Sequence, residues 1–275
     1  MNAVTLAGRA TQYGETDGNQ TDHDYSLIGG AKVCVTKSVK DVIHCLGGVQ
    51  VILPILSNVM RDVDVDQHRA IVCEGVYLLV ALLDGSRLNQ VTLTACDGYA
   101  LIANLLRSNG QKSLGPALIT ALDKLRRTGG LEHETSSARV VLDLRLWALA
   151  DAETQQQHGE YILSLAMKHA EGLRYHLPMS TIIDALEYTP GEAGVKRRRV
   201  LLEVLKHLIV GAPTRLVEEA AESIIYLIEE CADDEVVGDV LRFLVNLMQP
   251  GDVSQHTLNQ AFTKYGGPLL ALSSH

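Results

Sequence analysis

The chain has 275 residues, of which 47% are hydrophobic and 21% are charged, and its formal net charge at pH 7 is −9 with histidines counted as neutral. Binding to a phosphate backbone requires a basic surface that displaces counterions, so this acidic balance argues against nucleic acid as a partner. Aromatic residues make up only 4% of the chain, which favours a core of aliphatic side chains in thin layers of helices.

The cysteines and the N-terminus indicate the compartment. The five cysteines show no C-x-x-C spacing and lie in or beside apolar runs, which is typical of free thiols in a reducing compartment. The first residues lack the basic start and apolar stretch of a signal peptide. Residues 42–60 carry no Asp, Glu, Lys or Arg, but their apolar runs are much shorter than the ~20 residues of a membrane span. We expect a cytoplasmic, soluble chain without a transmembrane segment.

Residues 1–27 are polar and aperiodic, which predicts a poorly ordered N-terminal tail. From there to residue 268 the sequence predicts one armadillo-like helical domain, followed by a short C-terminal tail over residues 269–275. Helical periodicity and capping signals predict helices at residues 39–46, from 49 onward, and at 67–83, 88–96, 98–107, 114–127, 137–149, 152–171, 179–187, 196–210, 214–231, 235–248 and 254–265.

The first predicted helix has both of its ends marked in the sequence. Ser38 and Asp41 have the spacing of a capping box at its start, and Gly47-Gly48 is a typical helix end. Pro54 should kink the next helix or shift its start. Further along, Trp147 stands among leucines at helical spacing and is predicted to be core, while Asp151 marks the start of the helix after it.

The C-terminal third has the clearest helical periodicity. Within residues 214–231 the acidic side chains fall outside a stripe of apolar residues at helical spacing, namely Val217, Ala220, Ala221, Ile224, Ile225 and Ile228. Successive helices of this kind, joined by short turns, predict antiparallel helix pairs. Without a strict repeat signature, the expected fold is all-α: an armadillo/HEAT-like α-solenoid of irregular antiparallel helix pairs. A compact helical bundle is the alternative.

His44 and Cys45 are the one pair that suggests catalysis, because a thiolate nucleophile needs a nearby imidazole. Neighbouring residues on a helix, however, point about 100° apart. We therefore favour ordinary helical residues and keep a cysteine-dependent enzyme that uses Cys45 as an alternative.

Other candidate sites have simpler interpretations. The glycine doublets lack the spacing of a phosphate-binding loop, and the ten histidines show no H-x-x-x-H pair. The acidic cluster at residues 229–235 lacks the spacing of a calcium-binding loop and is expected to cap the helix that begins near Glu235. We predict no catalytic residue, no metal site and no cofactor.

The chain has one basic run, at Lys196, Arg197, Arg198 and Arg199. Such a cluster is a candidate contact for an acidic partner or an anionic membrane surface. The alternative is a solvated helix start without a partner.

Two stretches resemble a known family. The first is SVKDVIHCLGGVQVILPIL (residues 38–56), and the second is VVLDLRLWALADAETQQQHGEYILSL (residues 140–165), followed by LRYHLPMSTIIDALEY (residues 173–188). In this order they resemble the armadillo-like helical segment of the BEACH-domain (neurobeachin-like) proteins. The resemblance extends over roughly residues 28–248.

The resemblance implies a non-enzymatic protein-interaction scaffold of membrane trafficking, vesicle and lysosome processes or autophagy. Its expected partners are other proteins, with peripheral association at endomembranes. The chain has no room for the PH-like, BEACH and WD-repeat domains of that family, which suggests a fragment or a reduced relative, and the family supplies no catalytic residues to transfer. A HEAT/armadillo-like adaptor unrelated to BEACH proteins is the alternative, and the sequence predicts no oligomeric state.

Overall fold

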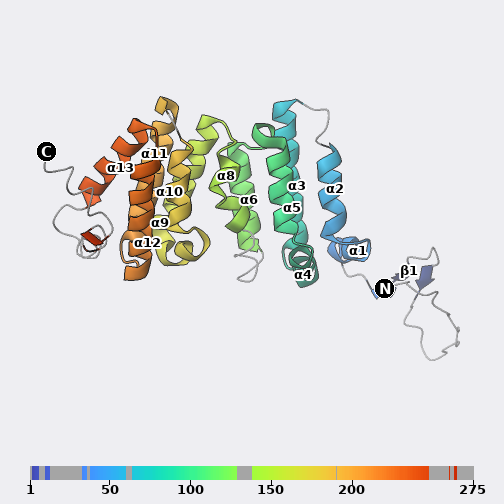
Figure 1. Ribbon diagram of the computed structural model, residues 1–275. Coiled ribbons are helices and arrows are strands. Elements are labelled where there is room, and N and C mark those ends of the chain that lie inside the picture. The colour runs from blue at the N-terminus through green and yellow to red at the C-terminus, as the bar shows by residue number, and fades with distance from the viewer. Residues whose placement is uncertain are drawn as a thin grey trace.

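The computed structural model describes residues 2–5, 10–12, 33–35, 38–59, 64–128, 138–189, 191–247, 260 and 263–264. In this part of the chain the helices form an elongated stack with α1 at one end and α13 at the other (Figure 1). They are α1 (Val39–Cys45), α2 (Val49–Val59), α3 (Val65–Leu83), α4 (Arg87–Ala95), α5 (Gly98–Asn109), α6 (Pro116–Thr128), α8 (Leu144–Trp147), α9 (Ala152–His176), α10 (Met179–Glu187), α11 (Gly191–Ile209), α12 (Thr214–Glu230) and α13 (Asp234–Leu247), with a 3-10 turn η1 (Gly110–Lys112).

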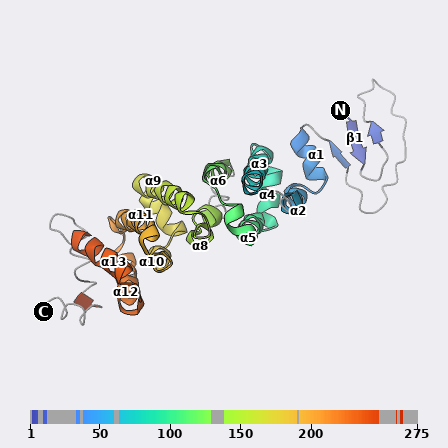
Figure 2. The same ribbon diagram turned by 90° about the horizontal axis from the view of Figure 1, so that it is seen from above.

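The helices alternate between two layers. In one layer α3, α6, α9, α11 and α13 contact one another in series, and in the other α2, α5, α8, α10 and α12 do the same (Figure 2). The short helix α4 contacts α2, α3 and α5. Since contacts run between neighbours along the stack rather than around one centre, the predicted α-solenoid is confirmed and the compact bundle is wrong.

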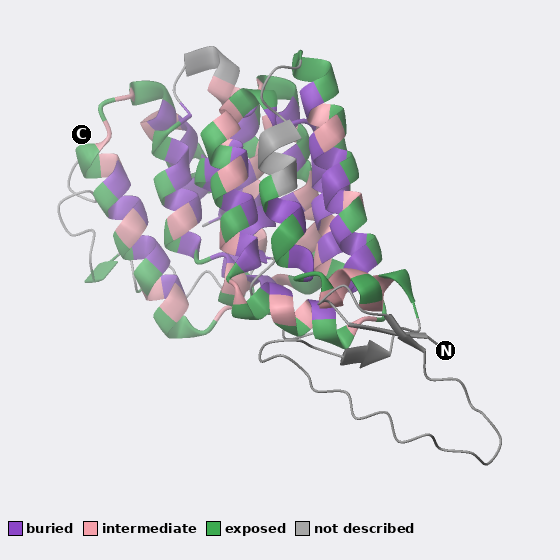
Figure 3. Cartoon of the chain, turned by 90° about the vertical axis from the view of Figure 1, so that its right-hand side faces the viewer, coloured by how far each residue is buried: buried purple, intermediate pink, exposed green. Residues whose placement is uncertain are grey.

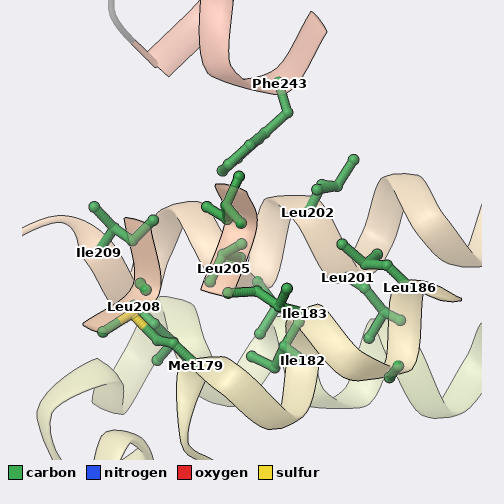
Figure 4. Close-up of a cluster of buried hydrophobic side chains, with 14 of the residues drawn as sticks. Met179, Ile182, Ile183, Leu186, Leu201, Leu202, Leu205, Leu208, Ile209 and Phe243 are labelled. Carbon is green, nitrogen blue, oxygen red and sulfur yellow. The ribbon is translucent and has the colours of Figure 1, made fainter. Parts of the chain in front are cut away.

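The interior between the layers contains two hydrophobic clusters. One is built from α2 to α8, and the other extends from α8 to α13. Figure 3 shows that buried residues lie on the sides of the helices that face their neighbours. Figure 4 shows the second cluster, where Met179, Ile182 and Ile183 of α10 meet leucines of α11. Only aliphatic side chains and single aromatics such as Phe243 are needed to fill these thin layers.

The first helical turn follows the sequence prediction. The Ser38 hydroxyl accepts a hydrogen bond from the backbone N–H of Asp41, and the Asp41 carboxylate accepts one from the N–H of Ser38 at 3.0 Å, so the capping box is confirmed. Gly47 and Gly48 have φ angles of 120° and 68°, which L side chains rarely adopt. These two glycines therefore turn α1 into α2, and Pro54 lies inside α2.

The single helix predicted over residues 137–149 is wrong, because the chain bends before Trp147. Residues 138–141 are helical, and a new short helix, α8, begins after Asp143. The Asp143 carboxylate accepts hydrogen bonds from the N–H groups of Arg145 and Leu146 at 3.1 and 3.0 Å, as an N-cap does. Trp147 is fully buried, which confirms its predicted place in the core.

Two other helices differ clearly from their predicted limits, whereas the remaining described helices agree to within about two residues. Helix α9 continues to His176, with a break in its helical geometry at His169, where φ is −145° and ψ is 45°. Helix α11 begins at Gly191, five residues before the predicted start. There the backbone of Gly194 passes so close to the Thr189 carbonyl that an added Cβ would lie 2.1 Å from its oxygen. The early helix start thus coincides with a close local contact to the residue before the helix and not with apolar periodicity.

Three strands precede the helices, and the sequence analysis does not predict them. Strands β1 (Asn2–Thr5), β2 (Ala10–Gln12) and β3 (Val33–Val35) form an antiparallel sheet in the order β2-β1-β3. The boundaries of the two predicted tails and of the domain between them stay predictions. The helix predicted over residues 254–265 lies mostly outside the described residues.

Candidate functional site

The basic run lies near the start of α11, where it divides between the interior and the surface. Arg197 and Arg198 are 6% and 1% exposed, whereas Lys196 and Arg199 are exposed. Lys196 and Arg199 therefore carry the charge that the run presents at the outer surface. The solvated alternative is wrong for Arg197 and Arg198, because internal hydrogen bonds hold these two side chains, whereas contact of the run with an acidic partner stays a prediction.

Arg198 joins three elements of the second cluster. Its Nε donates to Asp239 Oδ2 of α13 at 2.8 Å, its Nη2 lies 3.5 Å from Glu235 Oε2, and its Nη1 donates to the carbonyl of Thr189 after α10. Asp239 also accepts a hydrogen bond from Arg242 at 2.6 Å. A buried guanidinium is stable only where such partners replace water, so this network ties α11 to α13.

Arg197 bonds to α8 and α9 and has neutral partners. Its Nη1 donates to Gln155 Oε1 at 2.8 Å, and its Nη2 donates to the carbonyl oxygen of Leu144 at 3.1 Å. Burial lowers the pKa of Arg197 to about 10, which still leaves it charged at neutral pH. Among the ion pairs of the described residues none includes Arg197, so this cation is held without a carboxylate.

The centre of the stack carries a buried histidine that the sequence analysis does not single out. His158 of α9 stacks on Trp147 with ring centroids 4.5 Å apart, and its Nε2 lies 2.6 Å from the carbonyl oxygen of Val141. Burial lowers the pKa of His158 to about 3, to which the charge of Arg197 contributes, although the Val141 hydrogen bond opposes the shift. The ring is therefore neutral in the folded chain and donates to the carbonyl from Nε2.

His44 and Cys45 do not form a catalytic arrangement in the structure. His44 Nδ1 is buried and has no hydrogen-bond partner, so this nitrogen does not accept a hydrogen bond from the Cys45 thiol. Cys45 is the last residue of α1, is partly exposed and is in no disulfide. The pair takes ordinary helical positions, as the sequence analysis favours.

The acidic segment before α13 has the predicted capping role. The Asp233 carboxylate accepts hydrogen bonds from the N–H groups of Glu235 and Val236 at 2.9 and 3.3 Å. Across the described ranges, no group of three or more His, Cys, Asp or Glu side chains is placed to hold a metal ion. In the same part of the chain, no helix combines the length and the apolar character that crossing a bilayer requires.

Two grooves in the C-terminal half of the stack are candidate binding sites, and we name them by their relative size. The larger groove, of about 610 Å³, lies where α9 ends and α10 and α12 begin. Tyr175 is 83% exposed beside it, and Pro178 and Pro213 stiffen its walls. Arg174 spans the groove wall, where its guanidinium donates to the carbonyls of Leu208 and Val210 at 2.8 and 2.6 Å. The remaining lining residues are Glu171, Met179, Ser180, Gly211, Leu216, Glu219 and Ala220.

The smaller groove of about 320 Å³ lies between α8 and α10, with Arg197 of α11 also in its lining. Its apolar surface comes from Leu144, Ala148 and Ala185. The remaining lining residues are polar or aromatic: Arg145, Thr181, Asp184 and Tyr188. Neither groove could be predicted from local patterns, because each combines side chains from three helices, α9, α10 and α12 for the larger groove and α8, α10 and α11 for the smaller one.

The chain is similar to one described family. The family model for the Neurobeachin/BDCP, DUF4704 alpha solenoid region matches residues 18–188, which is more than half of the chain. The match ends with α10, whereas the resemblance was expected to continue to residue 248. No solved structure matches the chain. Since the matched region carries the described α-solenoid from α1 to α10, the chain belongs to the neurobeachin/BDCP alpha solenoid family.

Proposed function

We propose that the chain is a non-enzymatic protein-interaction scaffold, and that the larger groove is one of its docking sites. Membership in a neurobeachin-type solenoid family supports a scaffold segment of BEACH-family proteins. Solenoids bind partners over extended surfaces rather than in one enclosed pocket. The observation that carries the proposal is the exposed Tyr175 at the edge of the larger groove.

The larger groove has the features of a binding hot spot. Tyrosine is enriched at such positions because it offers a large apolar ring with a polar tip at little entropic cost. Tyr175 lies beside the apolar side chains of Pro178, Pro213 and Leu216, of which Leu216 is partly buried. We propose that a partner inserts an apolar side chain between Tyr175 and Leu216.

Photo-crosslinking tests this docking site. The chain is expressed in cells with a benzophenone amino acid in place of Tyr175, and in a second version in place of Tyr226, which is 66% exposed on α12 and outside the groove lining. We expect discrete crosslinked proteins from position 175 that position 226 does not give. Excess unlabelled chain should suppress these crosslinks by competition. A Tyr175→Ala chain should require at least about tenfold higher concentration for the same suppression, as expected for loss of a hot-spot side chain.

A Tyr226→Ala competitor is the matched control and should suppress the crosslinks as well as the unchanged chain. The same crosslinked proteins from both positions, or equal competition by Tyr175→Ala, would contradict the proposed site. Both variants replace an exposed tyrosine, so a general change in surface hydrophobicity cannot explain a difference.

We propose further that the scaffold acts in the cytoplasm, in membrane trafficking, lysosome-related processes or autophagy. The alternatives are an adaptor outside the BEACH proteins and an enzyme that uses Cys45. Family membership argues against the first, and the unpartnered Nδ1 of His44 argues against the second.

Lys196 and Arg199 are proposed to support peripheral contact with anionic membranes. Both are exposed near the start of α11, and each basic residue near an anionic surface contributes about 1 kcal/mol. The double change Lys196→Ala and Arg199→Ala is therefore expected to weaken binding to phosphatidylserine vesicles roughly 30-fold at low salt. Sedimentation with vesicles measures this, and equal binding by the double variant would remove the proposal.

A further inference from the structure

The smaller groove contains a cation that the fold does not neutralise. Only 6% of the Arg197 surface is exposed. Its two hydrogen-bond partners, Gln155 Oε1 and the Leu144 carbonyl, are nevertheless both neutral. Proteins usually pair a buried charge with an opposite one, because neutral dipoles replace only part of the lost hydration. Arg198, the next residue, follows that rule with Asp239. The contrast between these neighbours singles out Arg197.

A second arginine lies in the lining of the same groove. Arg145 of α8 is exposed, and among the described residues no ion pair includes its guanidinium. Asp184 of α10 is the one acidic residue in the lining, and the ion pairs of the described chain do not join it to either arginine. Two cations without carboxylate partners therefore border one cavity of about 320 Å³. Such a cavity is of the size that binds part of a ligand or peptide.

We propose that the smaller groove binds an aspartate or glutamate side chain of a partner peptide, with Arg145 and Arg197 as its counter-ions. Guanidinium groups recognise carboxylates through paired, charge-assisted hydrogen bonds, which are stronger where water is excluded. Leu144, Ala148 and Ala185 provide an apolar surface for a neighbouring side chain of the peptide, beside the ring of Tyr188. The acidic Asp184 in the lining disfavours a doubly charged phosphate at the same place. This inference rests on the proposed scaffold function and names the chemistry of one partner segment.

Selection from a random dodecapeptide display library tests the groove. The library is selected on the full chain and counter-selected on the Arg145→Glu chain, which reverses an exposed charge without touching the internal bonds of Arg197. We expect enriched peptides with an Asp or Glu next to an apolar residue. Fluorescence polarisation of single labelled peptides should show binding at least about tenfold weaker to Arg145→Glu and to peptides with the acid changed to its amide.

Arg87→Glu is the matched control, because Arg87 is an exposed arginine in the first turn of the distant helix α4. It should bind the peptides as the unchanged chain does. Arg197→Lys provides a second variant in the groove, and its circular dichroism spectrum and melting temperature are measured beside its affinity. Enrichment without acidic residues, or equal weakening by Arg87→Glu, would overturn the inference.

Two further outcomes would assign the groove to another ligand. Tighter binding of a phosphoserine version of the peptide than of the glutamate version would overturn the choice of a carboxylate. Loss of phosphatidylserine vesicle binding in Arg145→Glu, with no acidic peptide selected, would indicate a membrane instead. Crosslinks from position 175 do not depend on Arg145. If they persist, either of these outcomes would contradict only the inference about the smaller groove and leave the proposed scaffold function in place.

Discussion

Replacing Asp239 by alanine is expected to lower the free energy of unfolding by about 3–5 kcal/mol, the cost of removing one partner from a buried ion pair. Asp239 is buried and accepts hydrogen bonds from Arg198 at 2.8 Å and from Arg242 at 2.6 Å. Arg198 is 1% exposed, so its guanidinium cannot turn to water when the Asp239 carboxylate is lost, and it keeps the longer contact of 3.5 Å with the exposed Glu235. Urea unfolding followed by circular dichroism measures the change.

The double variant Arg198→Met and Asp239→Leu is the decisive comparison, because it removes both charges and leaves apolar side chains of similar length. Replacing a whole buried pair in this way is often close to neutral, so the double variant should be clearly more stable than Asp239→Ala. Glu229→Ala, at an exposed acidic position of α12, should change stability by less than about 0.5 kcal/mol. A double variant as unstable as the single one would show that the pair itself, rather than the stranded charge, holds α11 to α13.

Acid is expected to destabilise the chain through His158, by up to about 1.4 kcal/mol for each pH unit below pH 6. The folded state keeps this ring neutral, since burial lowers its pKa to about 3, whereas the unfolded chain binds a proton at an ordinary pKa of about 6.5. The unfolded state therefore binds more protons in the window between these values, and stability falls as pH falls through it. Above about pH 6.5 the contribution of His158 is fully present.

A His158→Gln variant isolates this effect. We expect it to be less stable at pH 7, because the stacking on Trp147 is lost, but to lose less stability between pH 6.5 and pH 4.5 than the unchanged chain. Urea midpoints at intervals of half a pH unit measure both slopes. Asp123 and Asp151 have lowered pKa values because hydrogen bonds and neighbouring arginines outweigh the opposing effect of burial, and both residues remain in both chains. Parallel slopes would contradict a neutral His158 in the folded state.

The helices could be predicted from the sequence where local signals agree with the packing. Helix α10 has the predicted bounds, Met179–Glu187, because its apolar stripe and the preceding Pro178 both mark it. The predictions failed where a side-chain cap or a close backbone contact within a few residues overrides the apolar periodicity. The apolar residues before and after Asp143 keep one helical periodicity, but the Asp143 side chain caps a new helix there and divides the run. At the other position, the close contact between Gly194 and Thr189 lies in a helix that begins before its apolar stripe.

The site was predicted less well than the fold, for a related reason. The basic run was recognised by composition, which does not indicate which side of a helix a charge occupies. Extending the buried stripe of Leu201, Leu202 and Leu205 back by one turn leads to Arg197 and Arg198, so periodicity could have placed both inside. Their different partners, a carboxylate for one and neutral groups for the other, depend on α9 and α13 and are not predictable from the run itself.

The second hydrophobic cluster has a practical consequence for choosing fragments to express. The family match ends at residue 188, but the inner face of α10, with Met179, Ile182 and Ile183, packs on α11 (Figure 4). A fragment cut at the family boundary would expose this face to water and would lack both Thr189 and Arg198, which bonds to its carbonyl. The unit suitable for purification therefore extends at least through α13, well beyond the segment that similarity alone would outline.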